Sequence, residues 1–201
     1  MKRSLIVLAL SAVAVAANAT VYTFSHSLIT IDPLGPAVTA DFTVIGLDGP
    51  IVDVDIVLNG LSHTYPDDIG AVLANNLGNN VLLFDGPGDG TDISLTWRFD
   101  DSAAGMLPNT GPLVGGSFQP GQNQWSDVFT NVSGPYGATM AGLNAGGDGT
   151  WSLFVEDFVG GDGGEITSQD LIITTNPVPE PASLVALGVG VAALMRRRRS
   201  K

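Results

Sequence analysis

The sequence predicts an all-β protein, an antiparallel jelly-roll-like β-sandwich with an N-terminal signal helix and a C-terminal short hydrophobic helix. Three observations carry this prediction. Apolar and polar residues alternate in several short runs, which is typical of strands with one buried face. The 201 residues include 26 Gly and 12 Pro, so turns are frequent and long helices are disfavoured. Helical periodicity of useful length is absent from the sequence between residues 20 and 175.

The clearest strand pattern begins at residue 51. Its apolar side chains are predicted to share the core face: Val52, Val54, Ile56 and Leu58. Its polar side chains are predicted to share the opposite face: Asp53, Asp55 and Asn59. A polar corner over residues 62–68 then leads to further apolar runs at residues 69–73 and 81–84.

The remaining strands are predicted in chain order over residues 21–25, 41–44, 93–99, 125–132, 150–156 and 166–175. Residues 25–37 are expected to form an irregular lead-in, residues 100–123 a long loop, and residues 139–143 a turn of helix. In the strand over residues 150–156, Trp151, Leu153 and Val155 should face inward, while Ser152 and Glu156 should face outward.

The first 19 residues are predicted to be a secretory signal peptide. Lys2 and Arg3 precede an apolar segment, and a small-x-small site places cleavage between Ala19 and Thr20. We expect the folded domain to span residues 20–176. The chain contains no cysteine, so an exported domain must be stabilised by core packing or by a metal instead of disulfides.

Residues 177–201 contain a Pro-rich break, an apolar run over residues 182–195 and four arginines. Fourteen helical residues span about 21 Å, which is shorter than the roughly 30 Å hydrocarbon core of a bilayer. Pro179-Glu180-Pro181, the short apolar helix and the Arg cluster resemble the PEP-CTERM sorting signal of Gram-negative bacteria. The resemblance implies recognition by an exosortase, a membrane cysteine peptidase, and delivery through the inner membrane to the cell surface or the exopolysaccharide matrix. A simple membrane anchor is the alternative.

Acidic residues dominate the predicted domain. Between residues 20 and 175 there are 19 Asp and Glu against Arg98 alone, a formal charge of −18. This charge argues against nucleic acid and anionic membrane surfaces as partners, and favours divalent cations or basic partners. A soluble, solvated surface is the alternative explanation.

Three motifs resemble the P/Homo B domain of proprotein convertases and related bacterial subtilases. They are the strand and corner that end in His63-Thr64 and Asp68-Ile69, the run Trp97 to Ala103, and the run Gly149 to Asp157 with Gly161 to Gly164. The resemblance implies a jelly-roll sandwich that stabilises a subtilisin-like protease, and a peptidase label could be inherited from it. The catalytic domain of such a protease is absent from this sequence, so we expect no peptidase activity.

Calcium is the cofactor that the acidic residues indicate. Asp67, Asp68, Asp157 and Asp162 lie at predicted loop–strand junctions, where oxygen ligands can surround a hard cation. The resemblance implies that the Asp67–Asp68 corner approaches the Asp157–Asp162 turn, and that Asp100 and Asp101 join either. The alternative is that these carboxylates cap turns. With two histidines and no Gly-x-Ser-x-Gly motif, His63 is expected to be a packed corner residue and not a catalytic base.

These observations predict a non-catalytic exported protein of the surface or exopolysaccharide matrix, which is sorted by an exosortase and contacts polysaccharide or a surface protein. One alternative is an accessory domain that acts with a subtilisin-like protease in trans. Another is an extracellular carbohydrate-active enzyme that uses carboxylate chemistry.

Overall fold

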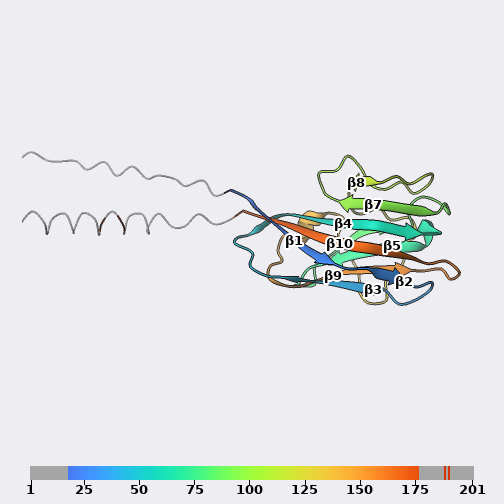
Figure 1. Ribbon diagram of the computed structural model, residues 1–201, viewed down its shortest axis with the longest axis horizontal. Helices are drawn as coiled ribbons and strands as arrows, with labels where there is room; N and C mark the ends of the chain where they lie inside the picture. The colour runs from blue at the N-terminus through green and yellow to red at the C-terminus, as the bar shows by residue number, and fades with distance from the viewer. Residues whose placement is uncertain (1–17, 177–187, 189, 191–201) are drawn as a thin grey trace, which may run out of the picture.

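The computed structural model describes residues 18–176 together with Gly188 and Gly190 (Figure 1). The predicted signal helix, the predicted C-terminal helix and the motif Pro179-Glu180-Pro181 lie outside the described residues. Of the predicted cleavage site, Ala19 is exposed and Thr20 begins the first strand. Among the described residues, no helix has the length and hydrophobicity that a bilayer span requires.

Two sheets form the sandwich, which confirms the predicted all-β class. The first sheet has the order β1-β10-β4-β7-β8, and β2 also pairs with β10. Its strands are β1 (Thr20–His26), β2 (Ile29–Ile31), β4 (Ile51–His63), β7 (Ile93–Phe99), β8 (Gly116–Phe118) and β10 (Gly164–Thr175). The second sheet has the order β3-β9-β5-β6. Its strands are β3 (Val38–Val44), β5 (Ile69–Ala74), β6 (Asn80–Asp85) and β9 (Gly149–Asp157). All pairs of strands are antiparallel except β7 with β8.

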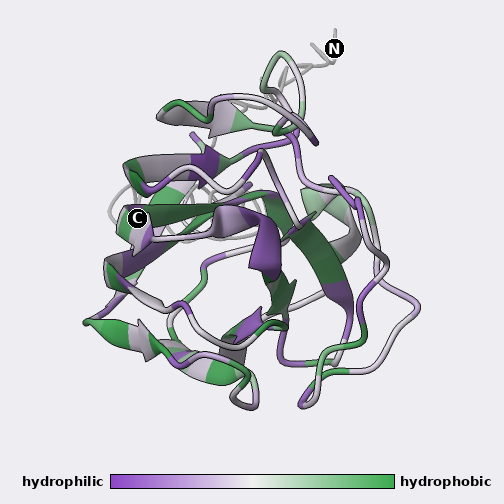
Figure 2. Cartoon of the chain, turned by 90° about the vertical axis from the view of Figure 1, so that its right-hand side faces the viewer, coloured by the Kyte–Doolittle hydropathy of each residue, from purple (hydrophilic) through white to green (hydrophobic). Residues whose placement is uncertain are grey.

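Aromatic side chains fill the space between the two sheets. Phe84 of β6 packs edge-on against Trp97 of β7 at 5.4 Å between ring centroids, and stacks on Phe99 at 5.7 Å. Trp151 of β9 is fully buried, and the inward positions of β9 alternate as predicted. In Figure 2, hydrophobic segments run along the strands in the middle of the molecule, and hydrophilic segments are frequent in the connecting loops.

Two bulges set which residues of β4 face the core. Val52 is 48% exposed although it was predicted to be buried, and Ile51 takes the core position at 6% exposure. The reason is a register shift against β10, where Thr174 pairs with Asp53 but Thr175 pairs with Ile51. A second shift lies between Leu58 and Leu61. It keeps both of these leucines in the core although they are three residues apart.

Residues from other segments cover two acidic side chains that the alternation predicted to be exposed. Asp55 of β4 is 2% exposed because Arg98 of β7 lies over it, with Arg98 Nη2 2.6 Å from Asp55 Oδ2. Glu156 of β9 is buried because the backbone N–H and the hydroxyl of Thr130 donate to its Oε2 atom, at 2.8 and 3.2 Å. Both acidic side chains are therefore buried because Arg98 or Thr130 covers them, and not because they face the core between the sheets.

The predicted strand over residues 125–132 is wrong, because these described residues form an irregular segment. Phe129 from this segment instead covers the outer face of the second sheet, where it packs with the buried Val72 and Leu82. Tyr136 and Phe158 meet the Phe129 ring edge-on. The predicted helical turn is present as η2 (Met140–Leu143), whereas β2 and β8 are strands where loops were predicted.

The described domain begins and ends at one end of the sandwich. Thr20 of β1 pairs with Thr175 of β10, and Thr175 also pairs with Ile51 at the start of β4. At the other end of the same strands, Gly164 pairs with His63 (Figure 1). We call the end that holds His63 the distal end, because it is opposite to the point where the C-terminal segment leaves the domain.

Candidate functional site

The predicted acidic corner and the predicted acidic turn meet at the distal end. The corner contains η1 (Pro66–Asp68), and β5 follows it directly. Ile69 at the start of β5 pairs with Asp157 at the end of β9, and the N–H of Phe158 donates to the carbonyl oxygen of Asp68 at 2.9 Å. Asp68 and Asp157 are therefore brought together by strand pairing.

His63 and Asp157 form a buried pair at this corner. His63 Nε2 lies 3.2 Å from Asp157 Oδ2, and both side chains are completely buried. The N–H of Tyr65 donates to His63 Nδ1 at 3.1 Å, so Nδ1 must be unprotonated and the neutral ring carries its proton on Nε2, towards the carboxylate. The angle of the Nε2 contact falls outside hydrogen-bond geometry, and neither atom has another hydrogen-bond partner among the described residues. His63 thus packs at the corner and is closed to a substrate.

Carboxylates near this pair repel one another. Burial raises the pKa of Asp68, and the nearby charges of Asp157, Asp162 and Asp67 raise it further, while His63 lowers it. Burial also raises the pKa of Asp157, against the opposing effects of the Val159 N–H and His63. Burial is therefore the main cause of both raised pKa values, and the nearby carboxylates add to it.

The four predicted calcium ligands are only partly available. Asp157 Oδ1 accepts from the N–H of Val159 at 2.9 Å, Asp162 Oδ1 accepts from the hydroxyl of Thr64 at 3.0 Å, and Asp67 Oδ1 accepts from Gln124 Nε2 at 3.0 Å. In the part of the chain that the structure describes, no three acidic or histidine side chains are arranged to hold a metal ion. The oxygen atoms have the right chemistry for calcium, but they form no ready ligand set, and calcium binding stays a prediction.

The expectation that Asp100 and Asp101 join this corner is wrong. His63 pairs with Ile93 at the distal end of the β4–β7 ladder, whereas Phe99, directly before Asp100, pairs with Ile56 at the other end. Asp100 Oδ1 accepts from the N–H of Ser102. Asp101 accepts through its two carboxylate oxygens from the N–H groups at the start of η2, each at 2.8 Å. These two aspartates therefore cap local turns.

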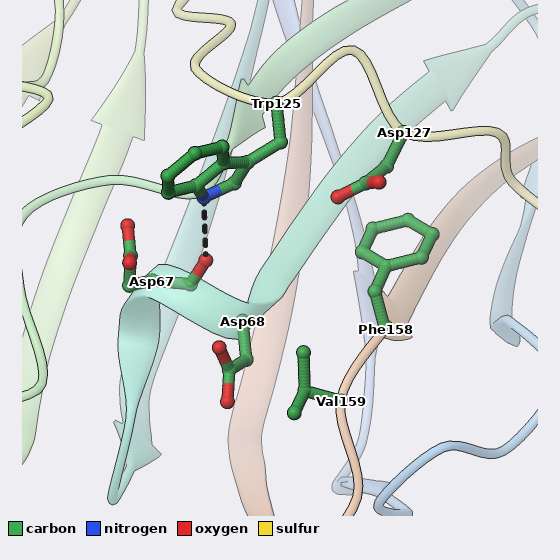
Figure 3. A pocket seen from close by; sticks show the side chains of 6 residues that line it. All are labelled: Asp67, Asp68, Trp125, Asp127, Phe158 and Val159. Carbon is green, nitrogen blue, oxygen red and sulfur yellow. Dashed lines mark hydrogen bonds between the residues drawn. The ribbon is translucent and has the colours of Figure 1, made fainter.

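A pocket of about 410 Å³ opens beside the corner. It is lined by three aspartates, two aromatic residues and one valine: Asp67, Asp68, Asp127, Trp125, Phe158 and Val159 (Figure 3). We call it the distal pocket. Trp125 is 55% exposed, and its indole N–H donates to the carbonyl oxygen of Asp67 at 3.2 Å. The indole is therefore held in place although one side of it faces solvent.

Gly86 makes room for this indole. A Cβ atom on Gly86 would lie 2.2 Å from Trp125 Cδ1, and Gly86 has a φ of +67°, a conformation that favours glycine. Sequence reasoning missed the pocket because it placed Trp125 in a strand. The available signal was a tryptophan among Gly, Asn, Gln and Ser, since such a stretch has too few apolar residues to bury the ring in a sheet.

Comparison with known proteins identifies the C-terminal segment but not the domain. Two crystal structures are similar to this chain: the serine protease of Aeromonas sobria in complex with its chaperone, and the serine protease of Aeromonas sobria. The first is 12% identical with a TM-score of 0.44, covering 80% of this chain and 28% of that chain. The second is 12% identical with a TM-score of 0.43, covering 79% of this chain and 27% of that chain. No curated protein sequence matches this chain. Residues 177–199, in contrast, match the family described as the PEP-CTERM protein-sorting motif.

Proposed function

We propose that this chain is an exported, non-catalytic protein of the cell surface or exopolysaccharide matrix, and that an exosortase recognises and processes its C-terminal segment. The match of residues 177–199 to the PEP-CTERM protein-sorting motif carries this proposal. Pro179, Glu180 and Pro181 lie at the start of the matched segment and the four arginines at its end. On this proposal the protein resides in the inner membrane only until the segment is processed.

The arrangement of the domain supports a role in presentation. Both ends of the domain lie at one end of the sandwich, and the acidic corner and the distal pocket lie at the other. The twelve residues of β10 separate the two ends by about 40 Å, at about 3.3 Å per residue. A domain attached through its C-terminal segment would hold the distal end away from the attachment point.

The burial of His63 supports the proposal that the protein is not an enzyme. His63 is buried, its Nδ1 atom accepts from the N–H of Tyr65, and its Nε2 atom faces Asp157. His26 Nδ1 lies 3.1 Å from Gln169 Oε1. A general base needs a free nitrogen within reach of a substrate proton, and the geometry of His63 does not provide one.

An accessory role with a subtilisin-like protease in trans is the second candidate. It is favoured by the contact between two of the three P/Homo B-like motifs: His63 meets Asp157, and Thr64 donates to Asp162. The test is to add this protein to a subtilase that lacks such a domain. A rise of several degrees in the melting midpoint of the protease would support the role, and an unchanged midpoint would contradict it.

We also propose calcium as a ligand of the acidic corner. A divalent cation would relieve the mutual repulsion that contributes to the raised pKa of Asp68. Chelation with EGTA, which should lower the melting midpoint, tests this ligand.

Cell fractionation tests the sorting proposal. Wild-type and exosortase-deficient cells are compared with an antibody against the domain, and with a Pro179→Ala/Pro181→Ala variant. We expect a shortened product at the surface or in the medium of wild-type cells, and the full chain in the inner membrane of the other two. Asp92→Asn, a change on the exposed surface of the domain, serves as the control and should be sorted normally. Retention of the intact tail in the inner membrane of wild-type cells would contradict the proposal.

A further inference from the structure

We propose that the distal pocket binds the guanidinium group of an arginine side chain from a partner protein, with Trp125 stacking on the planar group and Asp67 and Asp127 accepting its hydrogen bonds. This inference concerns what the domain binds, and it does not depend on how the tail is sorted. Three observations support it: the geometry of the Trp125 indole, the shortage of hydrogen-bond donors in the pocket, and the negative charge of its aspartates.

The indole of Trp125 is a preformed stacking surface. It is seated against Gly86, its N–H is fixed on the carbonyl oxygen of Asp67, and it is 55% exposed. Trp97 and Trp151, in contrast, are completely buried in the core. An exposed tryptophan that is held rigidly loses little conformational entropy when a flat group stacks on it.

The pocket presents acceptors and lacks donors. The indole N–H is used by Asp67, and the side-chain N–H of the adjacent Gln124 is used by Asp67 Oδ1. The N–H of Asp127 is used by Asp85 Oδ2 at 3.0 Å. A ligand must therefore bring hydrogen-bond donors to the carboxylates that line the pocket.

Two buried oxygen atoms of residues in or hydrogen-bonded to the segment over residues 124–127 also lack hydrogen-bond donors. Asp85 Oδ1 and Gln124 Oε1 have no hydrogen-bond partner among the described residues, and Asp85 is 1% exposed. Both residues contact the pocket segment, since the N–H of Gln124 donates to the carbonyl oxygen of Asp85 and the N–H of Asp127 donates to its carboxylate. Unpaired buried acceptors are costly, so donors in this region would be stabilising.

Charge selects a cation. Three aspartates line the pocket, and the one Lys or Arg between positions 20 and 175, Arg98, is paired with Asp55. A neutral sugar would leave the three charges uncompensated. A bare metal ion would gain nothing from the aromatic and aliphatic wall that Trp125, Phe158 and Val159 form.

Among organic cations, guanidinium fits the lining best. It is planar, it stacks on tryptophan, and its fork of N–H groups matches carboxylates, whereas an ammonium is compact and strongly hydrated. Charge-assisted bonds to a carboxylate are about twice as strong as neutral ones. The chemistry of the pocket therefore favours arginine over lysine.

The test is a titration of the full chain in nonionic detergent with N-acetyl-arginine amide. Because Trp97 and Trp151 are buried, acrylamide quenching of tryptophan fluorescence reports mainly on Trp125. A parallel sample with Arg196 to Arg199 replaced by Gln removes any competition from the arginines of the same chain. We expect saturable protection of Trp125, with N-acetyl-lysine amide binding about tenfold more weakly.

Variants separate the pocket from the general acidic field. Asp127→Asn should weaken arginine binding about tenfold, which corresponds to about 1.4 kcal/mol, since it removes one charge-assisted hydrogen bond. Asp92→Asn removes one charge from an exposed position outside the pocket and should leave binding within twofold. Trp125→Phe, followed by NMR of the probe, should weaken binding without removing it. Unchanged far-UV circular dichroism establishes that the variants are folded.

Several results would overturn the inference. Equal binding of the arginine and lysine probes would show that guanidinium is not selected. Binding of glucose or glucosamine without binding of the arginine probe would identify a saccharide site. Equal weakening by Asp127→Asn and Asp92→Asn would assign the effect to the overall charge. If the arginine probe protects Trp125 from acrylamide in neither sample, the pocket does not bind guanidinium. None of these results bears on sorting, which the fractionation experiment tests separately.

Discussion

Replacing Arg98 by Gln tests how the domain tolerates a buried carboxylate. Arg98 Nη2 lies 2.6 Å from Asp55 Oδ2, and the side chains are 41% and 2% exposed. Removing one partner from a fully buried ion pair costs about 3–5 kcal/mol, whereas exposed pairs contribute about 0–1 kcal/mol. Since solvent screens the arginine but not the carboxylate, we expect Arg98→Gln to lower the free energy of unfolding by about 2 kcal/mol at neutral pH.

This loss should depend on pH. Burial raises the pKa of Asp55 from 3.8 to about 6, with Asp53 adding to the rise and Arg98 opposing it. The folded state thus holds the proton more tightly than the unfolded chain, so the contribution of Asp55 to stability is present below about pH 4 and is lost as the pH rises through about 6. Without Arg98 the pKa of Asp55 rises further. At about pH 5 the carboxyl is then mostly neutral, and the Arg98→Gln variant should be nearly as stable as the wild type.

Thermal unfolding followed by circular dichroism measures both quantities. A loss of about 2 kcal/mol corresponds to a melting midpoint lower by about 4–8 °C for a domain of this size. Asp55→Asn in the Arg98→Gln background removes the unpaired charge and should restore most of the midpoint at neutral pH. The reasoning would be refuted if Arg98→Gln destabilised the protein equally at about pH 5 and about pH 7.5, or if the double variant were no more stable than the single one.

Three further predictions concern the distal end. His63→Ala replaces a completely buried ring by a cavity beside the buried Asp157 carboxylate, and chemical denaturation should show a loss of about 3 kcal/mol at neutral pH; a loss below 1 kcal/mol would show that the ring is not needed. Gly164→Ala should destabilise the domain severely, because the new Cβ would lie 2.0 Å from the carbonyl oxygen of Ser62, whereas Gly147→Ala has open space and should be nearly neutral. Equal melting midpoints of the two variants would contradict this prediction, since they would show that β4 and β10 can separate enough to accommodate the new Cβ atom. Exhaustive chelation with EGTA should lower the melting midpoint if the acidic corner binds calcium, and an unchanged midpoint would remove that proposal.

The sequence predicted which side chains face the core wherever a strand is regular. In β7 and β9 the inward side chains follow the alternation of the sequence, because each strand has one face on the core. The alternation failed at Val52, where a bulge set by pairing with β10 shifts the phase. It also failed to predict that Asp55 and Glu156 are buried, because the groups that cover them come from distant segments.

The site was predictable only in part, for a related reason. The approach of Asp68 to Asp157 was predicted from the resemblance to the P/Homo B domain. In the structure, the pairing of β5 with β9 brings these two residues together. The distal pocket combines segments around residues 67, 86, 125 and 158, and the segments around residues 86 and 125 carry no motif. A loop that contains hydrophobic residues, such as Phe129, has a sequence pattern similar to that of a strand. Only the structure shows that Phe129 covers the outer face of the second sheet.

The position of β10 determines how the domain would bear a load. This strand leads directly into the C-terminal segment, and it is hydrogen-bonded to β1 on one side and to β4 on the other. Tension applied through the tail would act along an interior strand and strain many hydrogen bonds at once. An edge strand pulled from its end would instead release its bonds one at a time. If the domain is attached through its C-terminal segment, as proposed above, the interior position of β10 would make it resist shear.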